Sequence, residues 1–299
     1  MNRRGILQGT ALGLAAAALP TIAADRRPLP ALDLEDPVTR ARVRAKMSGS
    51  TREKTVHGLT ALHLYAYRHE GNMKPLMTMY NYTVTKWKPA SATTFTMKHY
   101  ESGVYTRFNT MEVLEYWDNP FTNERRKVFP FLTGPINGTL GPDGMVTGAE
   151  ATVKPESMGI QVIGDQVYVP SQSSFSFPNP FNPKEWPKES SGPTYYWDSY
   201  STLSARLEDL ANADLDSVRT SQQFQNLVSW HPWLGMGNRP GRTFGRAYGN
   251  KLANGFSDVP VALRAAIEKQ TPEMLDVENW KGFRNDMEDY KKANPRPVG

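Results

Sequence analysis

The chain has 299 residues, with 35 lysines and arginines against 30 aspartates and glutamates, a formal net charge of +5. This charge is too small and too evenly spread to indicate nucleic-acid binding, and the length suits one large domain or two small ones. No cysteine is present, which excludes disulfides, iron–sulfur clusters, thiolate zinc sites, haem bound through a Cys-x-x-Cys-His motif and cysteine nucleophiles. The aromatic residues, with 23 glycines and 23 prolines, favour a β-rich fold.

The first 24 residues have the layout of a cleavable export signal. Arg3 and Arg4 form a twin-arginine pair, and an uncharged stretch follows from Gly5 to Ala24. The pattern predicts export to the periplasm by the twin-arginine (Tat) machinery, with no stable membrane insertion after cleavage. The alternative is an uncleaved anchor, since a spanning helix needs about 20 apolar residues. The stretch has few leucines and contains Pro20, which favours cleavage.

Residues 25–56 are polar and form an N-terminal extension, in which 36–46 could form a short helix. From residue 57 onward we expect a single β-rich domain. Residues 61–69 alternate aliphatic side chains with histidines and tyrosines, which is typical of a strand with one aliphatic and one aromatic-polar face.

Further short strands are predicted along the next part of the chain. They cover residues 76–87, 94–101, 104–108, 111–117 and 126–131. Ser102-Gly103 is expected to form a turn, and 134–148 a glycine-rich loop. Such regularly spaced strands predict an antiparallel meander or barrel.

The last part of the chain mixes strands and helices. Residues 170–193 contain six prolines and four bulky aromatic residues, which predicts an ordered lid or a loop that covers part of the core. Strands are expected over 195–210, 222–230 and 241–251, and helices over 260–269 and 280–292. The fold class is therefore mainly β: an antiparallel lipocalin-like barrel from His57 to about Lys251, with C-terminal helices. A two-sheet sandwich is the alternative.

The sequence has no Gly-x-Ser-x-Gly elbow, phosphate-binding loop or His-Glu-x-x-His motif. The most interesting polar residues are His99 and Glu101, which share a strand face, and Glu115 on a following strand. If they converge inside the barrel, a carboxylate and a histidine could exchange protons near neutral pH. The alternative is that Glu101 faces solvent and His99 is a core residue. A metal site would need His57, His99 or His231 together with carboxylates, and we expect no metal or cofactor.

Tyrosines form a second group of candidates. Tyr65, Tyr67, Tyr80 and Tyr82 either line the barrel, where they would bind an aromatic ligand or polarise an oxygen, or stack on its outer face. The segment from Trp230 to Gly237 either borders a pocket or closes one end of the barrel as core. The predicted substrate-binding residues are Tyr65, Tyr67, Tyr80, Trp117, Trp230, His231, Trp233 and Arg246.

Two motifs carry a resemblance to a known family. They are the segment from Glu115 to Thr122, which contains Trp-Asp-Asn-Pro-Phe-Thr, and the segment from Trp230 to Gly237. Together with the Tat leader, they resemble a family of exported bacterial proteins known as domain of unknown function 1838. The resemblance spans roughly Asp36 to the final helix. It implies export and supplies no established catalytic residues.

Two hypotheses for function follow. In the first, the protein is a cofactor-independent lyase or isomerase that acts on a small aromatic or apolar molecule. His99 and Glu115 are then the acid–base pair, and Tyr80 or Tyr82 polarises an oxygen. In the second, the protein is a periplasmic binding protein that holds such a molecule unchanged. Self-association as a homo-oligomer is compatible with both.

Overall fold

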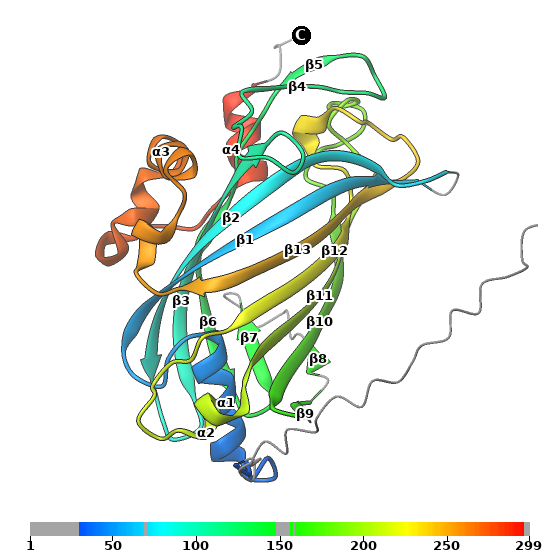
Figure 1. The fold of residues 1–299 in the computed structure, drawn as a ribbon. Helices are drawn as coiled ribbons and strands as arrows, with labels where there is room; N and C mark the ends of the chain where they lie inside the picture. Colours follow the sequence, from blue (N-terminus) through cyan, green and yellow to red (C-terminus); the bar gives the residue numbers. More distant parts are fainter. Residues whose placement is uncertain (1–29, 69–70, 148–155, 158, 296–299) are drawn as a thin grey trace, which may run out of the picture.

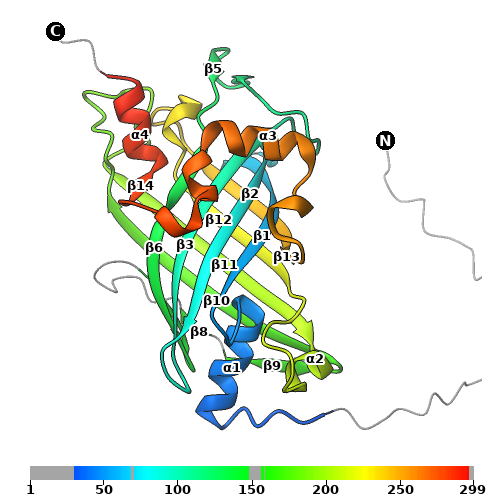
Figure 2. The same cartoon turned by 90° about the vertical axis from the view of Figure 1, so that its left-hand side faces the viewer.

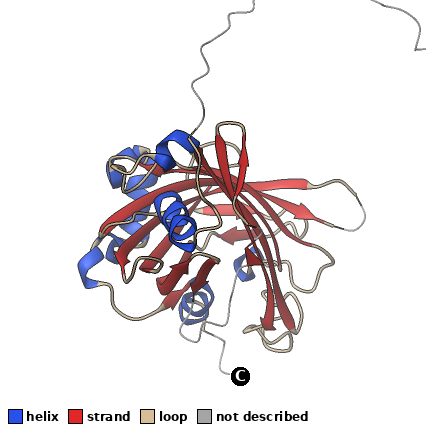
Figure 3. Cartoon of the chain, turned by 90° about the horizontal axis from the view of Figure 1, so that it is seen from below, coloured by secondary structure: helices blue, strands red, loops and turns tan. Residues whose placement is uncertain are grey.

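The computed structural model describes residues 30–68, 71–147, 156–157 and 159–295, so the expected export signal lies outside the described residues. The described chain forms one large antiparallel sheet that curls into a half-barrel (Figures 1 and 3). The strand order is β14-β6-β3-β2-β1-β13-β12-β11-β10-β8. The prediction of a mainly β, barrel-like antiparallel fold with C-terminal helices is confirmed, and the sheet stays open between its two edges.

The long strands of the half-barrel come from both halves of the chain. Their bounds are β1 (Lys54–Tyr67), β2 (Lys74–Pro89), β3 (Phe95–Thr106), β6 (Phe131–Gly141), β10 (Gln166–Pro178), β11 (Thr194–Arg206), β12 (Ser221–Val228) and β13 (Arg242–Leu252). The short strands are β7 (Gly144–Thr147), β8 (Glu156–Ser157), β9 (Gln161–Ile163) and β14 (Arg284–Asn285), and β4 (Tyr116–Asp118) pairs with β5 (Arg125–Lys127) in a separate hairpin.

Alternation along β1 sets the two faces of the sheet. Leu62 and Leu64 lie opposite Met79 and Met77 of β2, and all four side chains are buried in one cluster on the concave face. The side chains that alternate with them along β1, such as His63 and Tyr65, point to the convex face. Because successive side chains of a strand point to opposite sides, this register fixes the facing of every residue along the paired strands.

Helices of the C-terminal part cover the convex face. In α3 (Val261–Gln270), Leu263 and Ile267 are fully buried, and they pack against Tyr82 and Tyr100 of the sheet. The turns η2 (Gly255–Asp258), η3 (Pro272–Leu275) and η4 (Val277–Asn279) lie beside this helix. Figure 2 shows α3 on the outside of the sheet and α4 (Asp286–Ala293) near its upper end. The predicted helix over 260–269 is confirmed, and the second begins later than expected.

Helix α1 (Pro37–Ser48) fills the lower end of the half-barrel. Ala41 and Ala45 belong to a cluster with β2, β3 and β6, whereas Val43 and Met47 belong to a cluster with β10 and β11. Since the helix contacts both sides of the curled sheet, it lies on the concave face. Asp36 caps its first turn by accepting hydrogen bonds from the N–H groups of residues 38 and 39. The expected short helix is therefore part of the domain core.

The C-terminal end of α1 is held by a partly buried lysine. Lys251 Nζ donates to the carbonyls of Lys46 (2.7 Å) and Gly49 (3.2 Å) and to Ser217 Oγ (2.8 Å). Burial lowers the pKa of Lys251 to about 7. Its three acceptors match the three donors of an ammonium group, so no donor is left for a ligand. The lysine therefore stabilises the C-terminal end of the helix.

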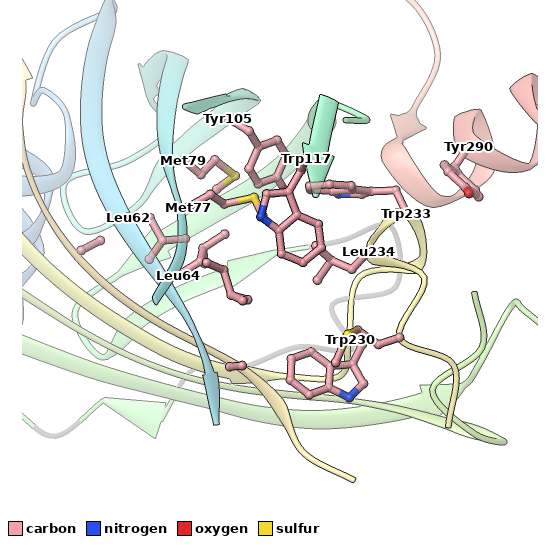
Figure 4. Close-up of a cluster of buried hydrophobic side chains, with 14 of the residues drawn as sticks. Leu62, Leu64, Met77, Met79, Tyr105, Trp117, Trp230, Trp233, Leu234 and Tyr290 are labelled. Carbon is pink, nitrogen blue, oxygen red and sulfur yellow. The ribbon is translucent and has the colours of Figure 1, made fainter. Parts of the chain in front are cut away.

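The upper end is closed by an aromatic cluster (Figure 4). Trp233, in the turn η1 (Pro232–Leu234), packs edge-on against Trp117 of β4, with ring centroids 6.1 Å apart. Asn119 Nδ2 donates to the Leu234 carbonyl at 2.8 Å. Arg126 Nε donates to the Trp233 carbonyl at 3.2 Å. The two sequence motifs noted above therefore pack against each other.

Three local predictions are wrong. Gly103 makes no turn but lies inside β3, where an added Cβ would come 2.6 Å from Met79 Sδ. The glycine-rich segment 134–148 begins as strands β6 and β7. The segment 170–193, expected to be a lid or a loop that covers part of the core, begins as strand β10. Phe181 after the strand is fully buried in the upper cluster, as the second alternative expects. In each case cross-strand pairing outweighs local turn composition.

Helix α2 (Leu207–Ala211) completes the lower end beside α1. Among the helices that the structure describes, none has the length and apolar character that crossing a membrane would need.

Candidate functional site

The middle of the concave face is polar, between α1 below and the aromatic cluster above. Strand register places on this face Thr60, Asn81, Thr83, Thr85, His99, Glu101, Ser199, Ser201, Gln222 and Asn226. Hydroxyl and amide groups thus surround one histidine and one carboxylate. This is the part of the half-barrel whose polar groups can face a ligand.

Four of these residues form a continuous chain of hydrogen bonds. Thr85 Oγ1 lies 2.7 Å from His99 Nδ1, and His99 Nε2 lies 2.8 Å from Glu101 Oε1. Asn81 Nδ2 donates to Glu101 Oε2 at 2.7 Å. The side chains of His99 and Glu101 retain 20% and 26% of their exposure, so the pair is sheltered but reachable.

The partners of Glu101 determine its charge. Burial by itself would raise the pKa of this carboxyl, but hydrogen bonds from His99 and Asn81 and the attraction of His99 hold the pKa below its usual value. Glu101 is therefore ionised at neutral pH and only accepts hydrogen bonds. His99 Nε2 must then carry a proton, and in the neutral ring Nδ1 accepts from the Thr85 hydroxyl.

An irregularity in the sheet lies directly beside this chain. The register between β3 and β6 shifts between His99 and Glu101, where His99 faces Ile136 but Glu101 faces Thr133. The extra residue on β6 falls opposite Tyr100. Bulges of this kind re-aim side chains and are frequent next to active sites.

The structure does not bring the predicted catalytic residues together. Glu115 is exposed in the loop before β4 at the upper end, where its carbonyl accepts the N–H of Val128. Tyr82 lies on the convex face, buried beneath α3, and its hydroxyl is 2.7 Å from His57 Nδ1. Neither shares the concave face with His99. The carboxylate partner of His99 is Glu101, two residues away on the same strand.

The predicted tyrosine lining is on the outside. Tyr65, Tyr67 and Tyr80 all point to the convex face, and Tyr67 is 42% exposed. Tyr65 contacts Phe108 edge-on, with ring centroids 5.3 Å apart. Arg246 is exposed on the same face. The alternative of tyrosines that stack on the outer face is therefore the one observed.

The predicted tryptophan site is core. Trp117, Trp230, His231 and Trp233 are all buried. Trp230 Nε1 donates to the Arg239 carbonyl at 2.9 Å. Burial lowers the pKa of His231 to about 4, so its ring is neutral. These residues close the upper end of the half-barrel. For the segment from Trp230 to Gly237, this is the second of the two predicted alternatives.

Asn81 and Thr85 were missed by sequence reasoning. Both lie on β2, in a run of threonines and tyrosines that carries no local sign of a site. Only the pairing of Thr85 with His99 and of Thr83 with Glu101 across β2 and β3 brings them to the carboxylate and the imidazole. Knowledge of the register would have been needed to find them.

A separate groove of about 730 Å³ lies away from this chemistry, at the lower end of β1–β3 and β6. It is lined by Lys86, Lys88 and Lys98. Lys86 pairs with Glu278 at 2.7 Å, and Lys98 donates to the Trp280 carbonyl at 3.1 Å. Lys86 and Lys98 thus hold the C-terminal segment to the sheet, so we do not place the site there.

Within the described residues, no three histidine, aspartate or glutamate side chains are grouped closely enough to bind a metal ion.

Comparison with known proteins identifies a family for this chain. None of the curated proteins compared with the chain matches it. The family model of proteins of unknown function DUF1838 matches residues 61–291, from β1 into α4. That match covers most of the chain and includes both sheet halves, the polar concave face and the two motifs of the upper cluster. The chain therefore belongs to the DUF1838 family of proteins of unknown function.

Proposed function

We propose that the protein is a cofactor-independent proton-transfer enzyme of the isomerase or lyase type, acting on a small organic molecule bound at the middle of the concave face. The observation that carries the proposal is the chain Thr85–His99–Glu101–Asn81. A reachable, ionised carboxylate held by two donors is a general base whose orientation is fixed before the substrate arrives.

Glu101 is the base in this proposal. Its carboxylate takes a proton from an acidic C–H group of the ligand and returns it to a neighbouring atom, so no oxidant or second substrate is needed. His99 and Asn81 occupy one oxygen each and act as positioning residues. The hydroxyl and amide side chains across the concave face supply hydrogen bonds to the polar part of the ligand.

One observation favours the alternative, a binding protein without catalysis. Both ring nitrogens of His99 already have partners in Thr85 and Glu101. A histidine without a free nitrogen cannot relay a proton unless one partner moves. In that case Glu101 serves as an anionic acceptor for a hydroxyl or ammonium group of the ligand.

The experiment begins with the contents of the site. Native mass spectrometry of protein isolated from the periplasm is expected to detect a retained small molecule. That molecule is then incubated with the protein in deuterium oxide, and deuterium uptake is followed by mass. We expect Glu101→Gln to slow uptake at least 100-fold, while the exposed-site control Glu115→Gln leaves it unchanged. Equal uptake in both variants would remove Glu101 from catalysis, and binding without uptake would support the alternative.

The export route belongs to the same proposal. The twin arginines support Tat export, and Tat substrates cross the membrane folded. Replacing both, Arg3→Lys with Arg4→Lys, is expected to leave the protein in the cytoplasm. A variant that still reaches the periplasm would contradict this route.

A further inference from the structure

Three buried hydrogen-bond donors without partners face one another at the upper end of the half-barrel. They are the hydroxyls of Tyr105 on β3 and Tyr195 on β11 and the indole N–H of Trp233. The three residues are 2%, 1% and 2% exposed. Within the described part of the chain, none of the three polar atoms makes a hydrogen bond of normal geometry, although the Trp233 N–H lies close enough to the Tyr105 hydroxyl to lower the pKa of Tyr105.

Their positions show that they converge. The rings of Tyr105 and Trp233 lie 5.0 Å apart in an edge-on arrangement, and Figure 4 shows both in the upper cluster. Tyr105 pairs with Met79, and Tyr195 and Trp197 share the face of Val228, so both tyrosines point to the concave side from separate walls. Burial raises the pKa of Tyr195, and the nearby Tyr105 adds to the effect.

Asp286, the first residue of α4, lies close to the same group. Burial raises its pKa to about 7. Burial, and next the Asp286 carboxylate, raise the pKa of Tyr105 and of Tyr195, and at Tyr105 the Trp233 N–H acts in the opposite direction. Neither hydroxyl donates to that carboxylate. The site thus offers three donors in surroundings whose burial disfavours ionisation of Asp286. The same burial disfavours a charged ligand, so the site suits an uncharged acceptor.

An aromatic surface continues from these donors toward solvent. Phe177 stacks on Tyr195, with centroids 5.2 Å apart and an interplanar angle of 26°. Phe175 stacks on Trp197 at 6.2 Å and 15°, and it is 36% exposed. Register places these rings on the concave face of β10 and β11. The three stacked pairs of this face form one continuous platform, since Phe175 also stacks on Phe177.

Buried polar atoms in native proteins are almost always hydrogen-bonded, so three donors without a hydrogen bond of normal geometry at one end of the half-barrel favour the binding of an acceptor there. We propose that this group is a binding site for an uncharged ring compound bearing a carbonyl: the carbonyl oxygen accepts hydrogen bonds from Tyr105, Tyr195 and Trp233, and the ring lies on the Phe175–Phe177–Trp197 platform. Such a site combines an apolar wall with a few convergent donors.

This site is distinct from the Glu101 site. Glu101 lies four residues before Tyr105 on β3, about 13 Å along a strand at the usual rise. Met79 and the side chain of Phe131 fill the space that a Cβ at Gly103 would occupy between them. A failure of one proposal therefore leaves the other standing.

The test uses a pair of probes that differ at the carbonyl. The full protein is titrated with 2-acetylnaphthalene and with 2-ethylnaphthalene, which lacks the oxygen, and binding is followed by probe fluorescence. We expect the ketone to bind at least tenfold more tightly. Tyr105→Phe and Tyr195→Phe should each remove most of the difference in affinity between the two probes. Neither substitution should weaken the binding of 2-ethylnaphthalene. Tyr82→Phe, a buried tyrosine of the convex face with a partner of its own, is the control and should keep the difference.

The platform is tested separately. Phe175→Ser should weaken both probes at least fivefold, whereas the control Tyr200→Ser, at an exposed tyrosine on the convex face of β11, should weaken neither. Thermal unfolding of each variant confirms that it is folded. The proposal is overturned if neither probe binds, if ketone and hydrocarbon bind equally, or if the double variant Tyr105→Phe, Tyr195→Phe retains the ketone preference.

Discussion

Two polar groups on the concave face of the half-barrel lie on the same strand and differ in almost every respect. Glu101 has a donor on each carboxylate oxygen, and its pKa is lowered. Four residues further along β3, Tyr105 has no partner, and the neighbouring carboxyl, Asp286, has a pKa raised to about 7. Burial opposes ionisation at both carboxyls: the side-chain partners of Glu101 outweigh it, whereas the backbone hydrogen bonds of Asp286 do not. In the first group both carboxylate oxygens have donors, although the amide oxygen of Asn81 has no partner among the described residues. In the second group the donors themselves make no hydrogen bond of normal geometry there.

The largest effect is expected from removing the carboxylate of the first group. Glu101→Ala leaves the Asn81 amide and the His99 ring N–H without an acceptor, and it should lower the free energy of unfolding by about 3 kcal/mol. Chemical denaturation measures this change. The control Glu115→Ala removes an exposed carboxylate and should change the free energy by less than about 0.5 kcal/mol.

A comparison of wild type with Glu101→Gln gives a pH test of the lowered pKa. A carboxyl whose pKa is lower in the folded state stabilises the protein above its unfolded pKa, about 4.3. This contribution is lost as the pH falls through the folded pKa. The difference in the free energy of unfolding between wild type and Glu101→Gln should therefore shrink below about pH 4. A difference that is constant from pH 3 to 8 would show that the hydrogen bonds do not stabilise the ionised form.

Asp286 should behave in the opposite way. Its raised pKa means that the folded state binds the proton more tightly than the unfolded state, so stability falls as the pH rises from about 4 to 7. Asp286→Asn is expected to match wild type near pH 4 and to be more stable by about 2 kcal/mol at pH 8. This figure is below the full linkage value of about 1.4 kcal/mol per pKa unit because solvent reaches part of the side chain. Thermal unfolding at both pH values checks it.

Tyrosine hydroxyls provide a smaller, matched comparison. Tyr82 has a partner, the His57 ring nitrogen at 2.7 Å, so Tyr82→Phe should cost about 1 kcal/mol. Tyr105 and Tyr195 have none, so Tyr105→Phe and Tyr195→Phe should leave the ligand-free protein equally stable or slightly more stable. If all three substitutions cost the same in denaturant unfolding, the two tyrosines have partners in solution.

The smallest effect concerns the far end of the hydrogen-bonded chain. Thr85→Val keeps the shape of the side chain and removes the hydroxyl beside His99 Nδ1, so it should cost about 0.5–1 kcal/mol. Thr83→Val, on the same strand and face, should cost less because that hydroxyl has no such bond to the histidine. Equal losses in the two variants would indicate that Thr85 does not orient the ring.

The sequence by itself determined the fold class and many of the elements. Alternation along residues 61–69 predicts a strand with an aliphatic face, and Leu62 and Leu64 are buried in β1 as expected. The helices α1 and α3 were also predicted, and for α3 the apolar spacing of Leu263 and Ile267 is a local signal. The pair His99 and Glu101 could be placed on one face because a strand repeats every two residues.

Only the tertiary structure decided which face is concave and which strands meet. Alternation shows that Tyr65 and Leu64 point in opposite directions, but the curl of the sheet and the position of α1 decide which of them faces inward. The partners of Glu101 come from β2 and those of Tyr105 from β11, η1 and α4, and such pairings depend on register and packing over many residues. Glu115 and Tyr82 could not be excluded from the site for the same reason, because facing and distance are properties of the folded sheet.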